Sequence, residues 1–322
     1  MLALADLDRV LRQRTLPPAC DDVQAWWPRW CALPPQGSTQ ESPQPSSATL
    51  AVLGGADADR VGWAFAAGYQ AALRALHPAL LHDAVAALCV TEDGGNHPRD
   101  VRTTFTPLPG GGVRIDGRKR WTTLGPAATV LLVVGRWVDP ASGADADAAR
   151  PQLRVAAVPG GTAGLSLAPL PGLRMVPEIP HTALRLDGVQ VDAAALLPGD
   201  GYERVVKPFR TLEDTHVALA MVAHLLRQAR GRGWPVEMQE RLAAVLTLLH
   251  TLATADAGAP ATHVALTGAL QAARLLYADA GAQLARTPDD PAAQRWLRDA
   301  PLFDVAAAAR SARAQRAWER LG

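Results

Sequence analysis

The order of helix-like and strand-like segments along the chain constrains the fold more than any other feature. Residues 58–77 repeat apolar side chains at helical spacing, and Pro78 ends that pattern. From about Leu88 the pattern changes to β-branched runs, of which TVLLVVGRWV (129–138) is continuous. After Gly201 long helical patterns return. The sequence therefore predicts an α+β protein with N-terminal helices, a middle antiparallel, barrel-like β-domain and a C-terminal four-helix bundle.

These changes of pattern also predict three domains. A short helical domain covers residues 1–86 and contains a Pro/Ser/Gln-rich linker at 35–48. The β-domain covers residues 87–200, and the helical bundle covers 201–322.

Local signals predict several smaller elements. ALLHDAV (79–85) has a short helical pattern, and residues 290–320 have a longer one. The pair Asp187-Gly188 indicates a turn between two short strands. Residues 139–150 indicate a surface loop.

Charge and composition exclude several classes of function. With 32 basic and 31 acidic residues the net charge is +1, so the chain has no basic field for nucleic acid or an anionic membrane. No apolar run is long enough to cross a bilayer, and the first residues lack a signal-peptide pattern. The 3 cysteines include no CxxC pair, and the 8 histidines include no HExxH motif. We therefore expect a cytoplasmic protein without a metal site.

Four motifs occur in one order between about residue 60 and the C-terminus. They are CVTEDGGNHPRD (89–100), GRKRWTTLG (117–125), the stretch PLPGLRMVPEIPHTALRLDG (169–188) with its continuation to Gly201, and WLRDAPLFDVA (296–306). In this order and at this spacing the chain resembles the acyl-CoA dehydrogenase family, as a divergent member with a shortened N-terminal domain. The resemblance implies a flavoprotein of fatty acid metabolism. It would bind FAD between the β-domain and the helices and oxidise the Cα–Cβ bond of an acyl-CoA or other acyl thioester.

Candidate flavin-binding residues lie in the first two motifs. A flavin ring needs a stacking surface and polar groups at its edge, which Trp121, Thr122 and Thr123 can provide at a strand end. By position, Trp121 and Thr123 match the family's flavin-flanking Trp and Thr, and Thr91 matches its flavin-contacting Thr. The competing interpretation is that Trp121 is an ordinary half-buried strand aromatic.

His97 stands where the family has a Ser that contacts cofactor and substrate. A histidine can donate a hydrogen bond near neutral pH, so His97 is a candidate substrate-binding residue. The alternative is a plain surface histidine in a Gly-Asn-His-Pro turn.

The reaction implied by the resemblance needs a carboxylate to remove the α-proton. Most of the family carries this Glu in the C-terminal segment, where this chain has Ala307. Some members place it on the first long helix of the bundle, where this chain has Glu213. Glu213 shares a largely apolar helix face with Val217, Ala220 and His224. Burial on that face would raise its pKa, as a base requires; the alternative is a solvated Glu beside Asp214.

The residues that hold the adenine half of FAD in the family are replaced. ARGRGWPVE (229–237) and YADAGAQLARTPDD (277–290) stand where the family has Arg-x-x-Phe-Gly and Gly-Gly-x-Gly. Arg230 and Arg232 remain as loose charges that could meet a phosphate.

Two hypotheses therefore stay open. The first is an FAD enzyme that acts on an acyl thioester with Glu213 as base. The second is a catalytically degenerate paralogue that acts as a structural or regulatory subunit without turnover. In both cases the resemblance implies a homo-oligomer, either a dimer or a tetramer.

Overall fold

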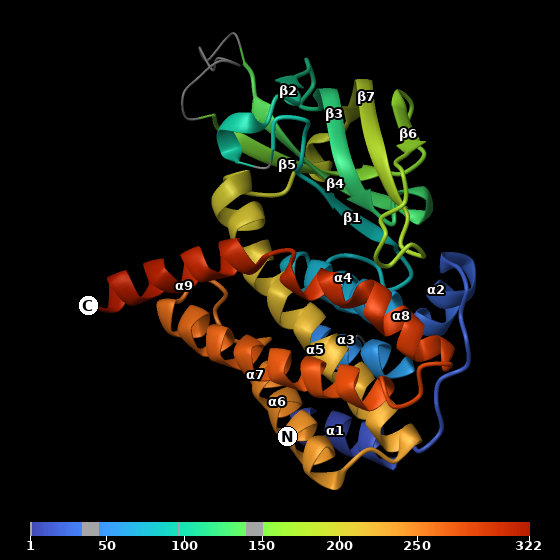
Figure 1. The fold of residues 1–322 in the computed structure, drawn as a ribbon. Coiled ribbons are helices and arrows are strands. Elements are labelled where there is room, and N and C mark those ends of the chain that lie inside the picture. The colour runs from blue at the N-terminus through green and yellow to red at the C-terminus, as the bar shows by residue number, and fades with distance from the viewer. Residues whose placement is uncertain (1, 34–44, 96, 140–150) are drawn as a thin grey trace. The chain divides into compact units, whose positions relative to one another are not determined.

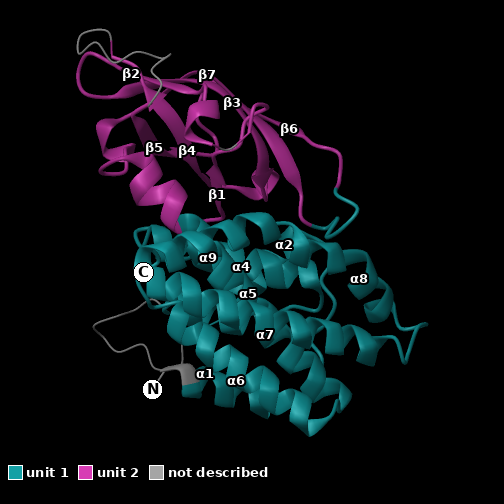
Figure 2. Cartoon of the chain, turned by 60° about the vertical axis from the view of Figure 1, so that its left-hand side comes forward, with its two compact units in different colours: residues 1–82, 173–178, 209–322 teal, residues 83–172, 179–208 magenta. Residues whose placement is uncertain are grey.

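The computed structural model describes residues 2–33, 45–95, 97–139 and 151–322. The chain falls into two compact units (Figure 2). The helical unit comprises Met1–His82, Leu173–Glu178 and Phe209–Gly322, and the β-unit comprises Asp83–Gly172 and Ile179–Pro208. The α+β class is confirmed, whereas the division into three domains stays a prediction. Most of the 35–48 linker and nearly all of the 139–150 loop lie outside the described residues.

The β-unit is built on one sheet (Figure 1). Its strands are β1 (Ala86–Cys89), β2 (Thr104–Pro107), β3 (Val113–Thr123), β4 (Val130–Trp137), β5 (Leu153–Pro159), β6 (Leu165–Pro169) and β7 (His181–Val191). The order is β1-β4-β2-β3-β7-β6, with β5 paired to β4. Because β4 runs parallel to both β1 and β2, the sheet is mixed rather than purely antiparallel as predicted.

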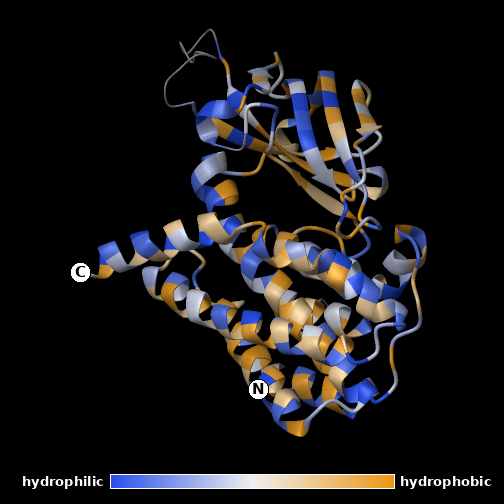
Figure 3. Ribbon diagram, in the orientation of Figure 1, coloured by the Kyte–Doolittle hydropathy of each residue, from blue (hydrophilic) through white to orange (hydrophobic). Residues whose placement is uncertain are grey.

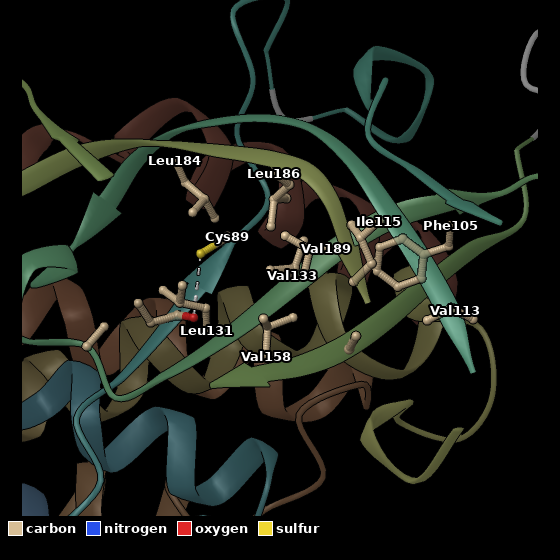
Figure 4. Close-up of a cluster of buried hydrophobic side chains, with 13 residues drawn as sticks. Cys89, Phe105, Val113, Ile115, Leu131, Val133, Val158, Leu184, Leu186 and Val189 are labelled. Carbon is tan, nitrogen blue, oxygen red and sulfur yellow. Dashed lines mark hydrogen bonds between the residues drawn. The ribbon is translucent and has the colours of Figure 1, made fainter. Parts of the chain in front are cut away.

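The strands curve around an apolar core, so the barrel-like character is retained (Figure 4). Side chains of β3 alternate: Val113 and Ile115 face the core, whereas Arg114 and Arg118 face solvent. Several hydrophilic positions of this strand are blue in Figure 3. The core also contains Cys89, Phe105, Leu131, Val133, Ala156, Val158, Leu184, Leu186 and Val189. Burial raises the pKa of the Cys89 thiol to about 12, so this cysteine acts as a core residue.

The predicted turn at Asp187-Gly188 is wrong, because β7 continues through it. Gly188 has φ +63° and donates its N–H to Asp116 Oδ1 at 2.8 Å. The pairing with β3 shifts register at this point, between Ile115 and Gly117. The Asp-Gly pair therefore forms a β-bulge instead of a hairpin.

The helical unit contains nine described helices. They are α1 (Leu2–Arg12), α2 (Val23–Cys31), α3 (Ser47–Asp57), α4 (Val61–Leu76), α5 (Lys207–Arg232, whose first two residues belong to the β-unit), α6 (Val236–Leu252), α7 (Pro260–Leu284), α8 (Pro291–Asp299) and α9 (Ala307–Leu321). The predicted helix at 79–85 is absent, and α3 includes residues assigned to the linker. The predicted helix at 290–320 is divided by a 3₁₀ segment, Ala300–Asp304, which contains Pro301.

Glycines bring α3 and α4 into direct backbone contact with α5. A Cβ on Gly55 would lie 2.1 Å from the carbonyl oxygen of Ala220, and one on Gly68 would lie 2.5 Å from the Cα of Val217. Any larger residue would push the helices apart. The face of α5 that carries Val217 and Ala220 is thus held rigidly against its neighbours.

Candidate functional site

The loop after β1 is fixed by one buried carboxylate, that of Glu92. It accepts hydrogen bonds from the backbone N–H groups of Arg102 at 2.7 Å and Thr103 at 3.0 Å. It also accepts from Thr103 Oγ1 at 2.7 Å and forms an ion pair of 2.6 Å with Lys119, whose side chain is fully buried. Sequence reasoning missed this pair, although Lys119 falls on the inward positions of β3 together with Val113 and Ile115.

Trp121 is turned out of the sheet at a second irregularity. The pairing of β3 with β7 shifts between Lys119 and Thr122, and Trp121 adopts φ +61°. This left-handed conformation is unusual for a bulky residue and costs on the order of 1–3 kcal/mol. The indole is 40 % exposed, and its ring centre lies 6.0 Å from that of His181 in an edge-to-face arrangement. The chain therefore holds a half-exposed aromatic ring in a strained conformation, which supports a stacking role.

The three threonines differ in what they present. The Thr91 carbonyl accepts from Arg120 N–H at 2.8 Å, which places Thr91 beside Trp121. Thr123 is mostly buried and pairs with His181 across the sheet. Thr122 is fully buried, and its hydroxyl lies 3.7 Å from the Cys89 thiol, so only its backbone could contact a ligand. Thr91, Trp121 and Thr123 thus share one edge of the β-unit, and their roles stay predictions.

His97 is exposed and caps the short 3₁₀ segment Pro98–Asp100. Its Nδ1 accepts from Arg99 N–H at 3.4 Å, and its backbone N–H donates to Asp100 Oδ2 at 3.2 Å. These contacts account for the residue locally, and its role toward a substrate stays a prediction.

Glu213 lies on α5 in the helical unit and is half-buried. Burial, reinforced by the neighbouring charge of Asp214 and opposed by Arg310, raises the pKa of Glu213 to about 7. Asp214 accepts from Arg310 at 2.8 Å and from Arg313 at 2.6 Å, both on α9. Within the described parts of the chain, no group hydrogen-bonds the Glu213 carboxyl. The two adjacent acids therefore differ: one is held by arginines, and the other is available to take up a proton.

The Arg-Asp-Ala motif is a structural anchor. Asp299 is fully buried and accepts from the Val176 N–H at 2.7 Å. Arg298 pairs with Asp299 at 2.7 Å and with Glu178 at 3.2 Å. These bonds attach the segment Leu173–Glu178 to α8. Ala307 begins α9 and brings no proton-transfer group.

The expectation that Arg230 and Arg232 are loose charges is wrong. Arg230 donates to the carbonyl of Leu11 at 2.9 Å and to Gln239 at 3.0 Å. Arg232 pairs with Asp290 at 2.5 Å. Both guanidinium groups are used within the helical unit.

Two further features concern the described residues: side-chain groups that could bind a metal ion, and helices that could span a membrane. These residues contain no group of three or more His, Cys, Asp or Glu side chains that could hold a metal ion. No described helix combines the length and the hydropathy that crossing a bilayer requires.

No family model matches the sequence, and no curated protein matches it either. Solved structures do match it along the whole chain, with the acyl-CoA dehydrogenase fold. Butyryl-CoA dehydrogenase from Megasphaera elsdenii has a TM-score of 0.67 and 15% identity over 98% of this chain and 96% of that chain. The prolyl acyl carrier protein oxidase AnaB has a TM-score of 0.67 and 16% identity over 100% and 99%. PigA with FAD and proline has a TM-score of 0.70 and 13% identity over 100% and 98%. The fold predicted from the motifs is therefore confirmed.

Proposed function

We propose that the chain is an FAD-dependent oxidoreductase that oxidises the Cα–Cβ bond of an acyl thioester. The observation that carries the proposal is Glu213, a half-buried carboxyl without a hydrogen-bond partner in the described chain, whose pKa is raised to about 7. A general base works best when its pKa is near the operating pH. The similar structures named above include a dehydrogenase of an acyl-CoA and an oxidase of a carrier-bound acyl group, so both kinds of thioester are candidates.

Residues of the β-unit would contact the flavin, and a residue of the helical unit would act as the base. The exposed indole of Trp121 would stack on the flavin ring, with Thr91, Thr123 and the Thr122 backbone at the ring edge. Bound FAD would supply the acceptor for the hydride. Glu213, in its carboxylate form, would take the α-proton, since Ala307 carries no group that can.

The absorption spectrum of the purified full chain tests the cofactor. We expect flavin absorbance, either as purified or after FAD is added and free FAD is removed. Anaerobic bleaching of that absorbance by a panel of acyl-CoA and carrier-bound thioesters then tests the reaction. A colourless protein that takes up no FAD would reject the proposal.

A second candidate is a family paralogue without turnover, acting as a structural or regulatory subunit. Ala307 and the engagement of Arg230 and Arg232 by protein groups favour it, because both remove parts that the family uses. This candidate predicts that no thioester in the panel bleaches the flavin, even where flavin binds.

We also propose a homodimer or a dimer of dimers. The C-terminal helices leave large apolar side chains exposed, namely Leu275 (64%), Trp318 (61%) and Leu321 (53%). Such side chains are frequent in protein–protein interfaces. Light scattering should give at least twice the chain mass, and a monomer at high concentration would contradict the proposal. Cytoplasmic location and a role in fatty acid metabolism stay predictions.

A further inference from the structure

The outward face of β3, β7 and β6 carries a groove that none of the predicted roles uses. In the register of the sheet, Arg118 on β3 lies opposite Arg185 on β7, and Arg185 lies opposite Ser166 on β6. The three residues therefore form one row across the sheet. Beside this row the facing pair Ala168 and Ala183 forms a floor of small side chains. With Arg120, these residues line a concavity of about 430 Å³, which we call the arginine groove. Its volume is within the range of small-molecule sites.

The positive charges of the groove, whose lining also includes Asp93, are only partly balanced by the protein. Two like charges directly opposite each other on neighbouring strands are destabilising, yet Arg118 and Arg185 occupy such positions. Arg185 pairs with Asp187 at 2.8 Å, but both side chains are exposed by about 60% or more, so solvent screens the pair. Within the described residues, Arg118 has no carboxylate partner. A bound anion would offset the repulsion in this row.

Lys119 lies between Arg118 and Arg120 in the chain, but it does not add to the positive charge of the groove. Its side chain points inward and is neutralised by Glu92 at 2.6 Å. Arg120 faces outward, pairs with the exposed Asp93 at 2.9 Å, and has its guanidinium 5.6 Å from the centre of the Trp121 ring. The groove therefore begins beside the ring predicted to stack on a flavin. Arg118 lies three positions before Trp121 on the same strand, which is roughly 10 Å from it at the usual rise per residue.

We propose that the arginine groove binds the phosphate ester of a ligand whose other end reaches Trp121. Guanidinium groups bind phosphate oxygens in a bidentate manner, and Ser166 adds a hydroxyl donor. The diphosphate of FAD and the phosphates of a coenzyme A thioester share this chemistry. A phosphate site here would replace Arg230 and Arg232, whose donors are already engaged. The proposal requires neither Glu213 nor turnover.

Calorimetric titration of the full chain with FAD, coenzyme A and riboflavin tests the groove. The test variant is Arg118→Gln with Arg185→Gln. The control is Arg114→Gln, an exposed β3 arginine outside the groove that pairs with Asp116 at 2.8 Å. We expect the double variant to bind FAD or coenzyme A about tenfold or more weakly, since it loses two charge-assisted contacts. The control should match the unchanged chain, and riboflavin, which has no phosphate, should bind all three proteins equally. Circular dichroism confirms that each variant is folded.

The ligand affected identifies the source of the phosphate. A loss confined to FAD assigns the groove to the cofactor's diphosphate, and a loss confined to coenzyme A assigns it to the substrate's carrier group. Equal losses in the double variant and the control, no loss in either, or no binding of FAD or coenzyme A to the unchanged chain would overturn the proposal. This test measures binding alone. If the groove variant weakens phosphate-dependent binding but no thioester bleaches the flavin, the proposed reaction is rejected and the phosphate site is retained.

Discussion

Two carboxylates, one in each unit, show opposite uses of burial. Glu92 in the β-unit accepts three hydrogen bonds and pairs with the fully buried Lys119. Glu213 in the helical unit is half-buried without a hydrogen-bond partner among the described residues, and its pKa is raised to about 7. The first arrangement stabilises the charged carboxylate and fixes a loop. The second destabilises the charge and leaves the group free to exchange a proton.

The difference distinguishes carboxylates that stabilise the fold from a carboxylate that is suited to proton transfer. Ionic groups that are well supplied with partners hold neighbouring segments together, as the buried Asp299 and its partner Arg298 also do for Leu173–Glu178. A carboxyl whose neighbours fail to satisfy it costs stability, and such costs concentrate at functional sites. The comparison predicts that changes at Glu213 affect the reaction, whereas changes at Glu92 or Lys119 affect folding.

The largest effect is expected for Glu213→Gln. The amide keeps the shape of the side chain but cannot accept the α-proton, so the rate of flavin bleaching by an active thioester should fall by about 10²–10⁴. Stopped-flow absorbance under anaerobic conditions measures it. The matched control is Glu203→Gln, an exposed acid that pairs with Lys207 at 2.7 Å. Bleaching at an unchanged rate in Glu213→Gln would assign the base to another residue.

Lys119→Met should have the largest effect on stability. It leaves Glu92 buried without its counter-charge, which typically costs about 3–5 kcal/mol of unfolding free energy. Urea unfolding followed by circular dichroism measures the loss. Arg114→Met breaks the exposed pair with Asp116 and should cost less than about 1 kcal/mol. Similar losses in both variants would remove the distinction between the buried and the exposed pair.

Hydrophobic periodicity predicted the long helices and strands, but not the short ones or a helix that is buried on all sides. The continuous β-branched run became β4. Helical spacing predicts helices over 235–254 and 260–286, and α6 and α7 match these ranges to within two residues. Helix α3 was missed because residues 48–56 are all buried, so its sequence, SATLAVLGGAD, lacks an amphipathic pattern. The interruption between α8 and α9 depends on Pro301, which local spacing did not reveal.

The candidate site was only partly predictable for a related reason. The family resemblance pointed to Trp121 and Glu213 as candidates, since residue type and spacing carry that information. They could not show that Asp214, rather than Glu213, is held by arginines, because those arginines lie 96 and 99 residues away in the chain. Nor could they show the bulge that exposes Trp121, since it arises from the pairing of β3 with β7.

Trp121→Ala should have a moderate effect on binding. Removing the stacking surface should weaken riboflavin binding by about 2–10-fold. This fold-change corresponds to the free energy that an aromatic contact contributes beyond its buried area. Trp121→Phe keeps a ring and should retain most of the affinity. Fluorescence quenching of riboflavin measures both. Since the residue has φ +61°, Trp121→Gly should not destabilise the fold and could raise the urea midpoint. Equal riboflavin affinity in all four proteins would place the flavin elsewhere.

The smallest expected effect is on the pH dependence of stability. The pKa of Glu213 rises from an ordinary 4.5 to about 7 on folding, so the folded chain retains a proton that the unfolded chain releases between these values. Stability from this group is therefore complete below pH 4.5, decreases as pH rises to about 7, and is constant above it. Because the side chain is only partly buried, solvent screens it, and the decrease should be smaller than the loss expected for Lys119→Met. Urea midpoints from pH 4 to 8 for the unchanged chain minus those for Glu213→Gln isolate this contribution. A difference that increases with pH would contradict the prediction, because it would mean that the fold favours the charged carboxylate of Glu213.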